Sequence, residues 1–163
     1  MTSYNIIEIG DDILRAQAAT VRRFDERLHK MLDEMAETMY EYEGVGLAAP
    51  QIGISKRIVV IDIGDGLVEL INPEITSMHG MVLGIEGCLS VPERQGYVYR
   101  AQTVHVKAQD RFGNHFEFDA SNYFARACQH ELDHLAGVLY VDKLANPTPQ
   151  EIAELEAAEE SEV

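Results

Sequence analysis

Two histidines and a glutamate near the C-terminal end of the chain have the spacing of a helical metal site. Residues 129–134 read Gln-His-Glu-Leu-Asp-His, which contains the pattern His-Glu-x-x-His. On a helix, side chains four residues apart lie on one face, so His130 and His134 can bind one metal ion together. Glu131 lies about 100° round the helix from His130, which suits proton transfer better than ligation. The pattern therefore predicts metal-assisted hydrolysis.

An exposed helix with two solvated histidines would show the same five residues, so the faces of the helix matter. We expect the helix to begin near Asp119 or Ser121, to run to about Ala136, and to stop at Gly137 in a left-handed conformation. One face carries Phe124, Cys128, Leu132 and Leu135, and another carries Tyr123, Ala127, His130 and His134. The histidines thus share a face with a small residue and an aromatic one, which favours burial over solvation.

A hydrolytic metal site needs a third protein ligand, and Cys88 is a candidate. Residues 86–92 read Glu-Gly-Cys-Leu-Ser-Val-Pro, a short extended run that ends at proline. A thiolate there could complete a Cys-His-His site with water as the fourth ligand. A buried free cysteine is the alternative on this segment alone. The other cysteine is Cys128, and two separated cysteines are not expected to form a structural disulfide in a cytosolic chain.

Composition limits the classes of function. The chain has 163 residues, of which 46% are hydrophobic and 25% charged, which is typical of one globular domain. Its net charge of −15 argues against a nucleic-acid surface and against docking on anionic lipid. Residues 1–5 carry no secretory signal pattern, and no apolar run has the length needed to cross a bilayer, so we expect a cytoplasmic protein.

The elements that must position these residues follow from hydrophobic periodicity. Residues 24–43 show a helical stripe, with Asp25 as the N-cap. A glycine-rich segment, 44–53, follows and lets the backbone approach other groups closely. Strands are expected at 57–63, 67–71, 81–85, 104–108 and 115–118, with Asn72-Pro73 ending the hairpin of the first two. The remaining histidines, His29, His79, His105 and His115, are expected to be structural or solvated.

Three segments together resemble the signature motifs of the peptide deformylases. They are residues 44–51 (Gly-Val-Gly-Leu-Ala-Ala-Pro-Gln), residues 86–90 (Glu-Gly-Cys-Leu-Ser) and residues 129–135, followed by Gly137. They occur in the order of that family and at similar separations. The resemblance implies an α+β fold in which antiparallel β-sheets surround a central metal-bearing helix, with an N-terminal helix. We expect one catalytic domain at 1–147 and a short acidic C-terminal tail at 148–163.

The resemblance also implies an activity. Peptide deformylases remove the N-formyl group from the N-terminal methionine of newly made polypeptides and release formate. They use one divalent metal ion, expected here to be Fe²⁺, although Ni²⁺, Co²⁺ or Zn²⁺ can occupy such a site. By motif position, Cys88, His130 and His134 would be the ligands and Glu131 the catalytic acid and base. The Gln51 side chain and the Leu89 backbone N–H would bind the formyl oxygen.

The substrate contacts follow from the residues that flank the motifs. Gly46 would let the substrate backbone lie against the chain, and an apolar pocket for methionine would be lined by Val45, Ile85, Tyr123 and Ala127. Two positions depart from the pattern of some members. Arg94 is displaced by one position from the expected substrate-contacting arginine, and Tyr99 stands in place of a proline, which puts substrate preference in doubt.

Residues behind the ligands are predicted as well. Ligand histidines usually donate their second N–H to a carboxylate or a carbonyl, for which Glu86, Asp133 or the backbone could serve. Asp133 could equally form a structural salt bridge. Arg100 is expected to pair with Glu86 and so to hold the Cys88 loop.

Two alternatives remain open. A different His-Glu-x-x-His amidase or peptidase would need a third ligand downstream, and no suitable histidine or glutamate motif follows His134. A metal-retaining paralogue without catalysis would be expected to lack Glu131 or Gln51, and both are present. The expected partners are N-formylmethionyl peptides, with no DNA and no membrane. Transient proximity to the ribosome is compatible with this role, but the acidic tail argues against docking through a basic helix.

Overall fold

The computed structural model describes residues 4–161, so the outer ends of the predicted domain and tail, 1–3 and 162–163, lie outside the described residues. The helices are α1 (Glu26–Glu41), α2 (Asn122–Leu135) and α3 (Pro149–Ser161), with short 3-10 turns η1 (Asp12–Arg15), η2 (Ala49–Ile52) and η3 (Tyr140–Lys143). The strands are β1 (Gly46–Ala48), β2 (Ile58–Ile61), β3 (Val68–His79), β4 (Val82–Cys88), β5 (Val91–Arg100), β6 (Thr103–Gln109) and β7 (His115–Ser121).

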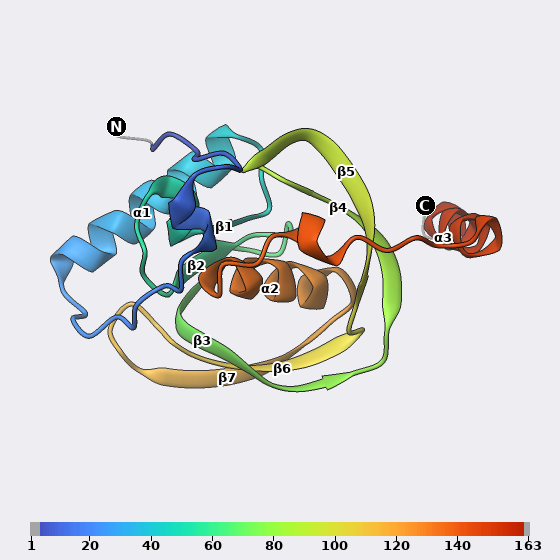
Figure 1. Cartoon of the computed structure of the whole chain (residues 1–163). Helices are drawn as coiled ribbons and strands as arrows, with labels where there is room; N and C mark the ends of the chain where they lie inside the picture. The colour runs from blue at the N-terminus through green and yellow to red at the C-terminus, as the bar shows by residue number, and fades with distance from the viewer. Residues whose placement is uncertain (1–3, 162–163) are drawn as a thin grey trace.

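Two antiparallel sheets surround the helix α2. One has five strands in the order β1-β2-β3-β6-β7, and the other is the hairpin β4-β5. The five-stranded sheet curves beneath α2, and the hairpin arches along the other side of that helix (Figure 1). This architecture confirms the expected α+β fold with a central helix.

The N-terminal helix α1 forms where its hydrophobic stripe predicts. The side chain of Asp25 caps it by accepting a hydrogen bond from the Leu28 N–H, as expected. Buried residues recur at helical spacing, including Leu28, Leu32 and Met35, and pack with the buried strand β2. The helix thus closes the sheet on the side of β1 and β2 and supports the glycine-rich segment that follows it.

The prediction that Asn72-Pro73 ends a hairpin is wrong, because β3 continues through both residues to His79. The register between β3 and β6 shifts between Ile71 and Glu74, which marks a β-bulge. Asn72 adopts a positive φ of 52° there, and its side-chain amide donates to the Val21 carbonyl at 3.0 Å. A bulge tolerates proline inside a strand because no ladder N–H is required at that point.

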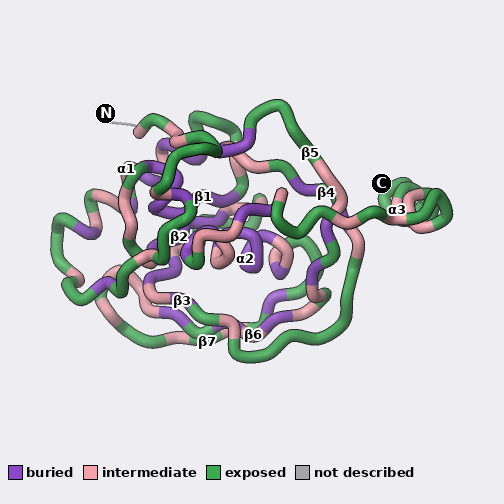
Figure 2. The backbone as a smooth tube through the Cα atoms, in the orientation of Figure 1, coloured by how far each residue is buried: buried purple, intermediate pink, exposed green. Residues whose placement is uncertain are grey.

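The central helix α2 is buried on more of its circumference than the two faces identified in the sequence. Much of α2 is coloured as buried in Figure 2. Its buried residues include the polar Gln129, His130, Glu131 and His134. Gln129 ties the helix to the residue after β5, donating to the Ala101 carbonyl at 2.9 Å and accepting from its N–H at 3.0 Å. Ser121 takes the N-cap position, whereas Asp119 lies within β7. Gly137 has the left-handed φ predicted for it, 77°.

The acidic segment after residue 147 forms the helix α3, which projects from the rest of the molecule (Figure 1). Its surface is mostly exposed (Figure 2). Glu151 on α3 accepts a hydrogen bond from the Tyr99 hydroxyl, so the tyrosine that departs from the family pattern contacts this helix. Among residues 4–161, no helix combines the length and the apolar character needed to cross a membrane.

Candidate metal centre

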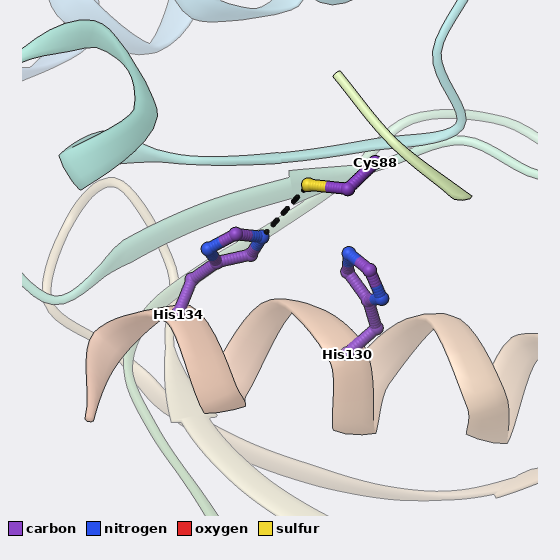
Figure 3. A group of neighbouring side chains, drawn as sticks. All are labelled: Cys88, His130 and His134. Carbon is purple, nitrogen blue, oxygen red and sulfur yellow. Dashed lines mark hydrogen bonds between the residues drawn. The ribbon is translucent and has the colours of Figure 1, made fainter. Parts of the chain in front are cut away.

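Cys88, His130 and His134 come together at the centre of the molecule. One ligand atom from each residue lies within 4.8 Å of the others. The Cys88 Sγ is 3.3 Å from the His134 Nε2. Both imidazoles extend from α2 toward Cys88 (Figure 3). The two histidines are buried and Cys88 is half-buried, so the cluster lies largely away from solvent.

The hairpin β4-β5 brings Cys88 to this position. The strands pair regularly from Val82 opposite Arg100 to Gly87 opposite Gln95, and the register then shifts so that Cys88 lies opposite Val91. Ser90 and Val91 are buried, which anchors the tight turn after the cysteine. The irregularity therefore turns the thiol at the end of β4 toward the helix.

The residues of the cluster fit a divalent metal ion. A thiol and two imidazoles are the donors of many zinc and iron sites. The His130 Nδ1–H donates to the Glu86 Oε1 at 2.8 Å, which leaves the Nε2 to face the cluster. Burial alone would lower the pKa of His130, but the adjoining Cys88 and Glu86 side chains raise that pKa to about 10. Burial lowers the pKa of His134 well below its usual value.

Glu86 is the hub of a buried polar network around His130. Arg100 donates to both of its oxygens, at 2.8 and 2.9 Å, as predicted. Arg100 also donates to the Asp133 Oδ2 at 2.6 Å, so Asp133 forms the structural salt bridge that was one of its two predicted roles. Burial opposes ionisation of Glu86, but the bonds from Arg100 and His130 outweigh it and hold the pKa of this carboxyl far below its usual range.

Glu131 is buried beside the group of Cys88, His130 and His134 without being part of it. Its Oε1 has no hydrogen-bond partner among the described residues. Burial raises the pKa of this carboxyl to about 7. A buried carboxyl with that pKa exchanges a proton readily near neutral pH. The unpartnered oxygen leaves room for a water molecule or a substrate group to bind.

A glycine is expected to be required at position 46 for the observed placement of the Glu131 side chain, which lies against it. A Cβ on Gly46 would come within 2.4 Å of the Glu131 Oε2. The φ of Gly46 is not positive, so its backbone would accept alanine and the conflict is purely steric. We expect Gly46→Ala to displace the Glu131 carboxylate. If Glu131 has the acid–base role expected from the sequence, kcat for the expected hydrolysis should fall by about a hundredfold, the effect of misplacing a reacting group by about 1 Å. Steady-state kinetics on metal-loaded protein would test this, and unchanged kcat at equal metal content would contradict it.

Gln51 lies on the other side of the cluster with its amide held in one orientation. Its Oε1 accepts from the Ala48 N–H at 2.9 Å. Its Nε2 therefore points toward the hairpin, where it donates to the Ser90 Oγ at 3.1 Å and lies 3.5 Å from the Cys88 Sγ. Leu89 follows the cysteine directly, and its side chain packs against Gly44.

A cavity of about 670 Å³ opens onto this cluster. It is lined by the predicted substrate residues Val45, Gly46, Ile85, Tyr123 and Ala127, together with Gln51, Cys88, Leu89, His130 and Glu131. Arg94 is exposed on β5 and is not among the described residues that line the cavity. The structure thus brings the predicted substrate residues together around one cavity, except for Arg94, which does not line it.

Two residues of the site were missed by sequence reasoning. Arg126 lines the cavity and donates to the Glu86 Oε2 at 2.6 Å. The ring of Tyr140 stacks on His130, with centroids 6.1 Å apart. Arg126 precedes His130 by four residues, and this spacing alone could have indicated that both side chains lie on the same face of the helix. Tyr140 lies beyond the helix and carried no local signal.

The other histidines lie elsewhere, as expected. The His29 Nε2 is 2.7 Å from the Arg111 carbonyl oxygen, and His105 lies beside the Asp119 and Glu117 carboxylates. Within the described part of the chain, neither these two nor His79 and His115 belong to a group of three metal-binding side chains.

Comparison with known proteins gives concordant matches. A sequence model of the family described as polypeptide deformylase matches residues 3–150. A peptide deformylase of Caldicellulosiruptor bescii is 57% identical over 134 residues, which cover 82% of this chain and 81% of that protein. The crystal structure of the peptide deformylase from Thermotoga maritima superposes with a TM-score of 0.88 at 46% identity, covering 90% of this chain and all of that one. A Met-Ala-Ser-bound peptide deformylase from Acinetobacter baumannii has a TM-score of 0.84 at 37% identity, covering 88% and 99%.

Proposed function

The chain belongs to the polypeptide deformylase family, and we propose that Cys88, His130 and His134 hold the metal ion with which it acts. It is a metal-dependent hydrolase that removes the N-formyl group from the N-terminal methionine of new polypeptides and releases formate. The observation that supports the ligand assignment is the convergence of the three donor atoms within 4.8 Å, beside a cavity that is lined by Cys88, His130, Glu131 and Gln51.

We propose Fe²⁺ as the resident ion, with Ni²⁺, Co²⁺ and Zn²⁺ able to occupy the same donors. One thiolate and two imidazoles suit all four ions, and availability in the cell decides between them. When bound, such an ion supplies Lewis acidity, which polarises the formyl carbonyl and favours loss of a proton from water near neutral pH. The remaining steps belong to the side chains around it.

Glu131 is proposed to move the proton. Its carboxylate takes a proton from the attacking water, and the new C–O bond makes the formyl carbon tetrahedral. Glu131 then gives that proton to the methionine nitrogen as the bond between this nitrogen and the formyl carbon breaks. A free amine and formic acid leave, and the acid ionises to formate. A pKa of about 7, raised by burial, suits both the uptake and the release of this proton.

Gln51 and Leu89 are proposed to stabilise the oxygen of the formyl group as it gains charge. Gln51 and Leu89 both line the cavity next to Cys88, and the donors that we assign are the Gln51 side-chain amide and the Leu89 backbone N–H. The Gln51 amide is preorganised, because its oxygen is already engaged by the Ala48 N–H. Loss of one such donor typically lowers kcat by about a hundred- to a thousandfold.

The methionine side chain is proposed to enter the cavity between Val45, Ile85, Tyr123 and Ala127, while the substrate backbone lies against Gly46. Support comes from their position on the cavity wall beside Glu131. The Met-Ala-Ser peptide bound to the deformylase of A. baumannii supports a methionyl ligand. Arg94 lies between the cavity residues Glu93 and Gln95, and we assign it to peptide residues farther from the methionine.

The wider context is proposed from charge. We propose a cytoplasmic enzyme with one catalytic domain ending near residue 147, followed by the acidic helix α3. The segment 149–161 contains five glutamates and no lysine or arginine. Such a helix would be repelled by ribosomal RNA, so any transient contact with the ribosome would use another surface. The alternatives, another His-Glu-x-x-His hydrolase or a non-catalytic paralogue, are not favoured.

Formate release from a formyl-Met-Ala-Ser peptide tests this function and its metal. We expect anaerobically purified protein to release formate, removal of the metal by a chelator to abolish release, and added Fe²⁺ to restore it. Zn²⁺ added to the same metal-free protein measures how far the activity depends on the ion. If protein loaded with iron or nickel released no formate, the proposal would be overturned.

A further inference from the structure

The two halves of the proposed metal site belong to elements that share no backbone ladder. Cys88 lies at the end of β4 in the two-stranded sheet, whereas both histidines lie on α2. A two-stranded hairpin on its own is only marginally stable in water. The geometry between thiol and imidazoles therefore depends on the side chains that link this hairpin to the helix.

Arg126 makes the broadest of these links. From α2 its Nη1 donates to the Glu86 Oε2 at 2.6 Å and to the Val98 carbonyl at 3.1 Å. Its Nη2 donates to the Val82 carbonyl at 2.8 Å. One guanidinium thus reaches both strands of the hairpin and the carboxylate that orients His130. The planar fork of arginine allows such simultaneous contacts, and lysine cannot reproduce them.

The hairpin is shaped to receive this guanidinium. A Cβ on Gly84, in the middle of β4, would come within 2.6 Å of the Arg126 Cζ and within 2.7 Å of its Nη2. The Arg126 side chain is only 11% exposed. The missing side chain at residue 84 therefore leaves the space in which the guanidinium lies flat against the strand.

Arg100 has a different role, although it binds the same carboxylate. It comes from β5, so its two bonds to Glu86 hold the carboxylate within the hairpin. Its bond to Asp133, the bond between Glu86 and His130, and the 3.3 Å contact between the Cys88 Sγ and the His134 Nε2 also link the hairpin to α2. Arg126 adds to these links a guanidinium that extends from α2 and binds β4, β5 and the Glu86 carboxylate together.

We propose that Arg126 is a positioning residue that sets the distance and orientation between the Cys88 thiol and the two histidines. It acts through Glu86 on the His130 ring and through the Val82 and Val98 carbonyls on the hairpin that carries Cys88. This inference rests on the proposed ligand set of Cys88, His130 and His134. Without the contacts of Arg126, the Cys88 thiol and the histidines are held less firmly before the ion binds. The affinity for the metal ion should therefore fall in protein that is still folded.

Cobalt binding by the full chain tests the proposal without relying on activity. Wild-type protein with Co²⁺ is expected to show thiolate-to-cobalt charge-transfer absorption, which Cys88→Ala abolishes. Arg126→Met is expected to raise the Co²⁺ dissociation constant, measured by competition with a chelator, by about ten- to a hundredfold. The charge-transfer band should weaken or shift. The Co²⁺ dissociation constant of Arg126→Lys should lie between those of the wild type and Arg126→Met, since lysine keeps one charged contact with Glu86.

Gly84→Ala provides an independent variant, because it keeps Arg126 and displaces the guanidinium by steric conflict. It should shift the dissociation constant in the same direction as Arg126→Met. Arg27→Met is the matched control, since Arg27 is an exposed helical arginine on α1. Its affinity for Co²⁺ should equal that of the wild type. Should Arg126→Met fail to fold by circular dichroism, Arg126→Lys and Gly84→Ala supply the measurement.

Two outcomes would overturn the proposal, and they are distinguishable. If the wild type shows the thiolate band and the folded variants bind Co²⁺ as tightly as it does, Arg126 has no positioning role. A lower melting temperature of the metal-free variants with unchanged Co²⁺ affinity would have the same meaning, because it indicates general stability alone. If the wild type itself lacks the thiolate band, the ligand set is wrong and the inference falls with it.

Discussion

Replacing Glu131 with glutamine is expected to lower kcat for deformylation by about a hundred- to ten-thousandfold, the range that general acid–base catalysis supplies. The amide is nearly the same size as the carboxylate, so the packing against Gly46 remains. It cannot accept a proton from water, and it cannot return one to the departing amine. Because Glu131 is not one of the three grouped donors, the metal content should stay at the wild-type level.

Formate release under saturating peptide, together with metal content measured on the same sample, tests this expectation. Glu156→Gln on the exposed face of α3 is the matched control and should keep the wild-type kcat. If fully metal-loaded Glu131→Gln protein retained a kcat within about tenfold of the wild type, another group would have to move the proton.

Replacing Glu86 with glutamine is expected to have the largest effect on stability. The Glu86 side chain is 5% exposed and that of Arg100 is 2% exposed, so the mutation leaves a buried guanidinium without its main counter-charge. Removing one partner of a buried ion pair typically costs about 3–5 kcal/mol. Here Arg126 and His130 lose the same partner, which should also weaken metal binding.

Denaturant unfolding in the presence of a chelator isolates the stability effect, since bound metal would add its own stabilisation. Asp33→Asn is the matched control, because Asp33 pairs with Arg111 at the surface with 67% of its side chain exposed. Such exposed pairs contribute about 0–1 kcal/mol. A loss for Glu86→Gln no greater than for the control would show that the buried network contributes little to the fold.

The sequence predicted those elements whose signal is local. The helices α1 and α2 and the strands β6 and β7 each repeat their apolar residues with the period of the structure they form, and β2 is a short continuous apolar run. The helix-terminating roles of Asp25 and Gly137 were predicted correctly for the same reason, because a helix cap depends on its immediate neighbours in the sequence.

Elements that depend on a partner strand were missed. The strand β5 contains Pro92, Gly96 and several charges, which oppose strand propensity, and it is extended because β4 pairs with it. The three-residue strand β1 carries too short a pattern to read, and it forms by pairing with β2. The bulge at Asn72 likewise depends on the side-chain bonds of that residue to Val21 and Gln109.

By itself the sequence predicted the candidate donors and the chemistry that we propose for them. The spacing of His130 and His134 places both imidazoles on one face of a helix, and the three motifs identify the family, because those relations hold within short segments. Only the tertiary structure decided that the Cys88 thiol lies 3.3 Å from His134, 46 residues away, and that Glu86 joins His130, Arg100 and Arg126 in one buried network. These separations depend on how a hairpin packs against a helix, and sequence spacing does not encode distances of that kind.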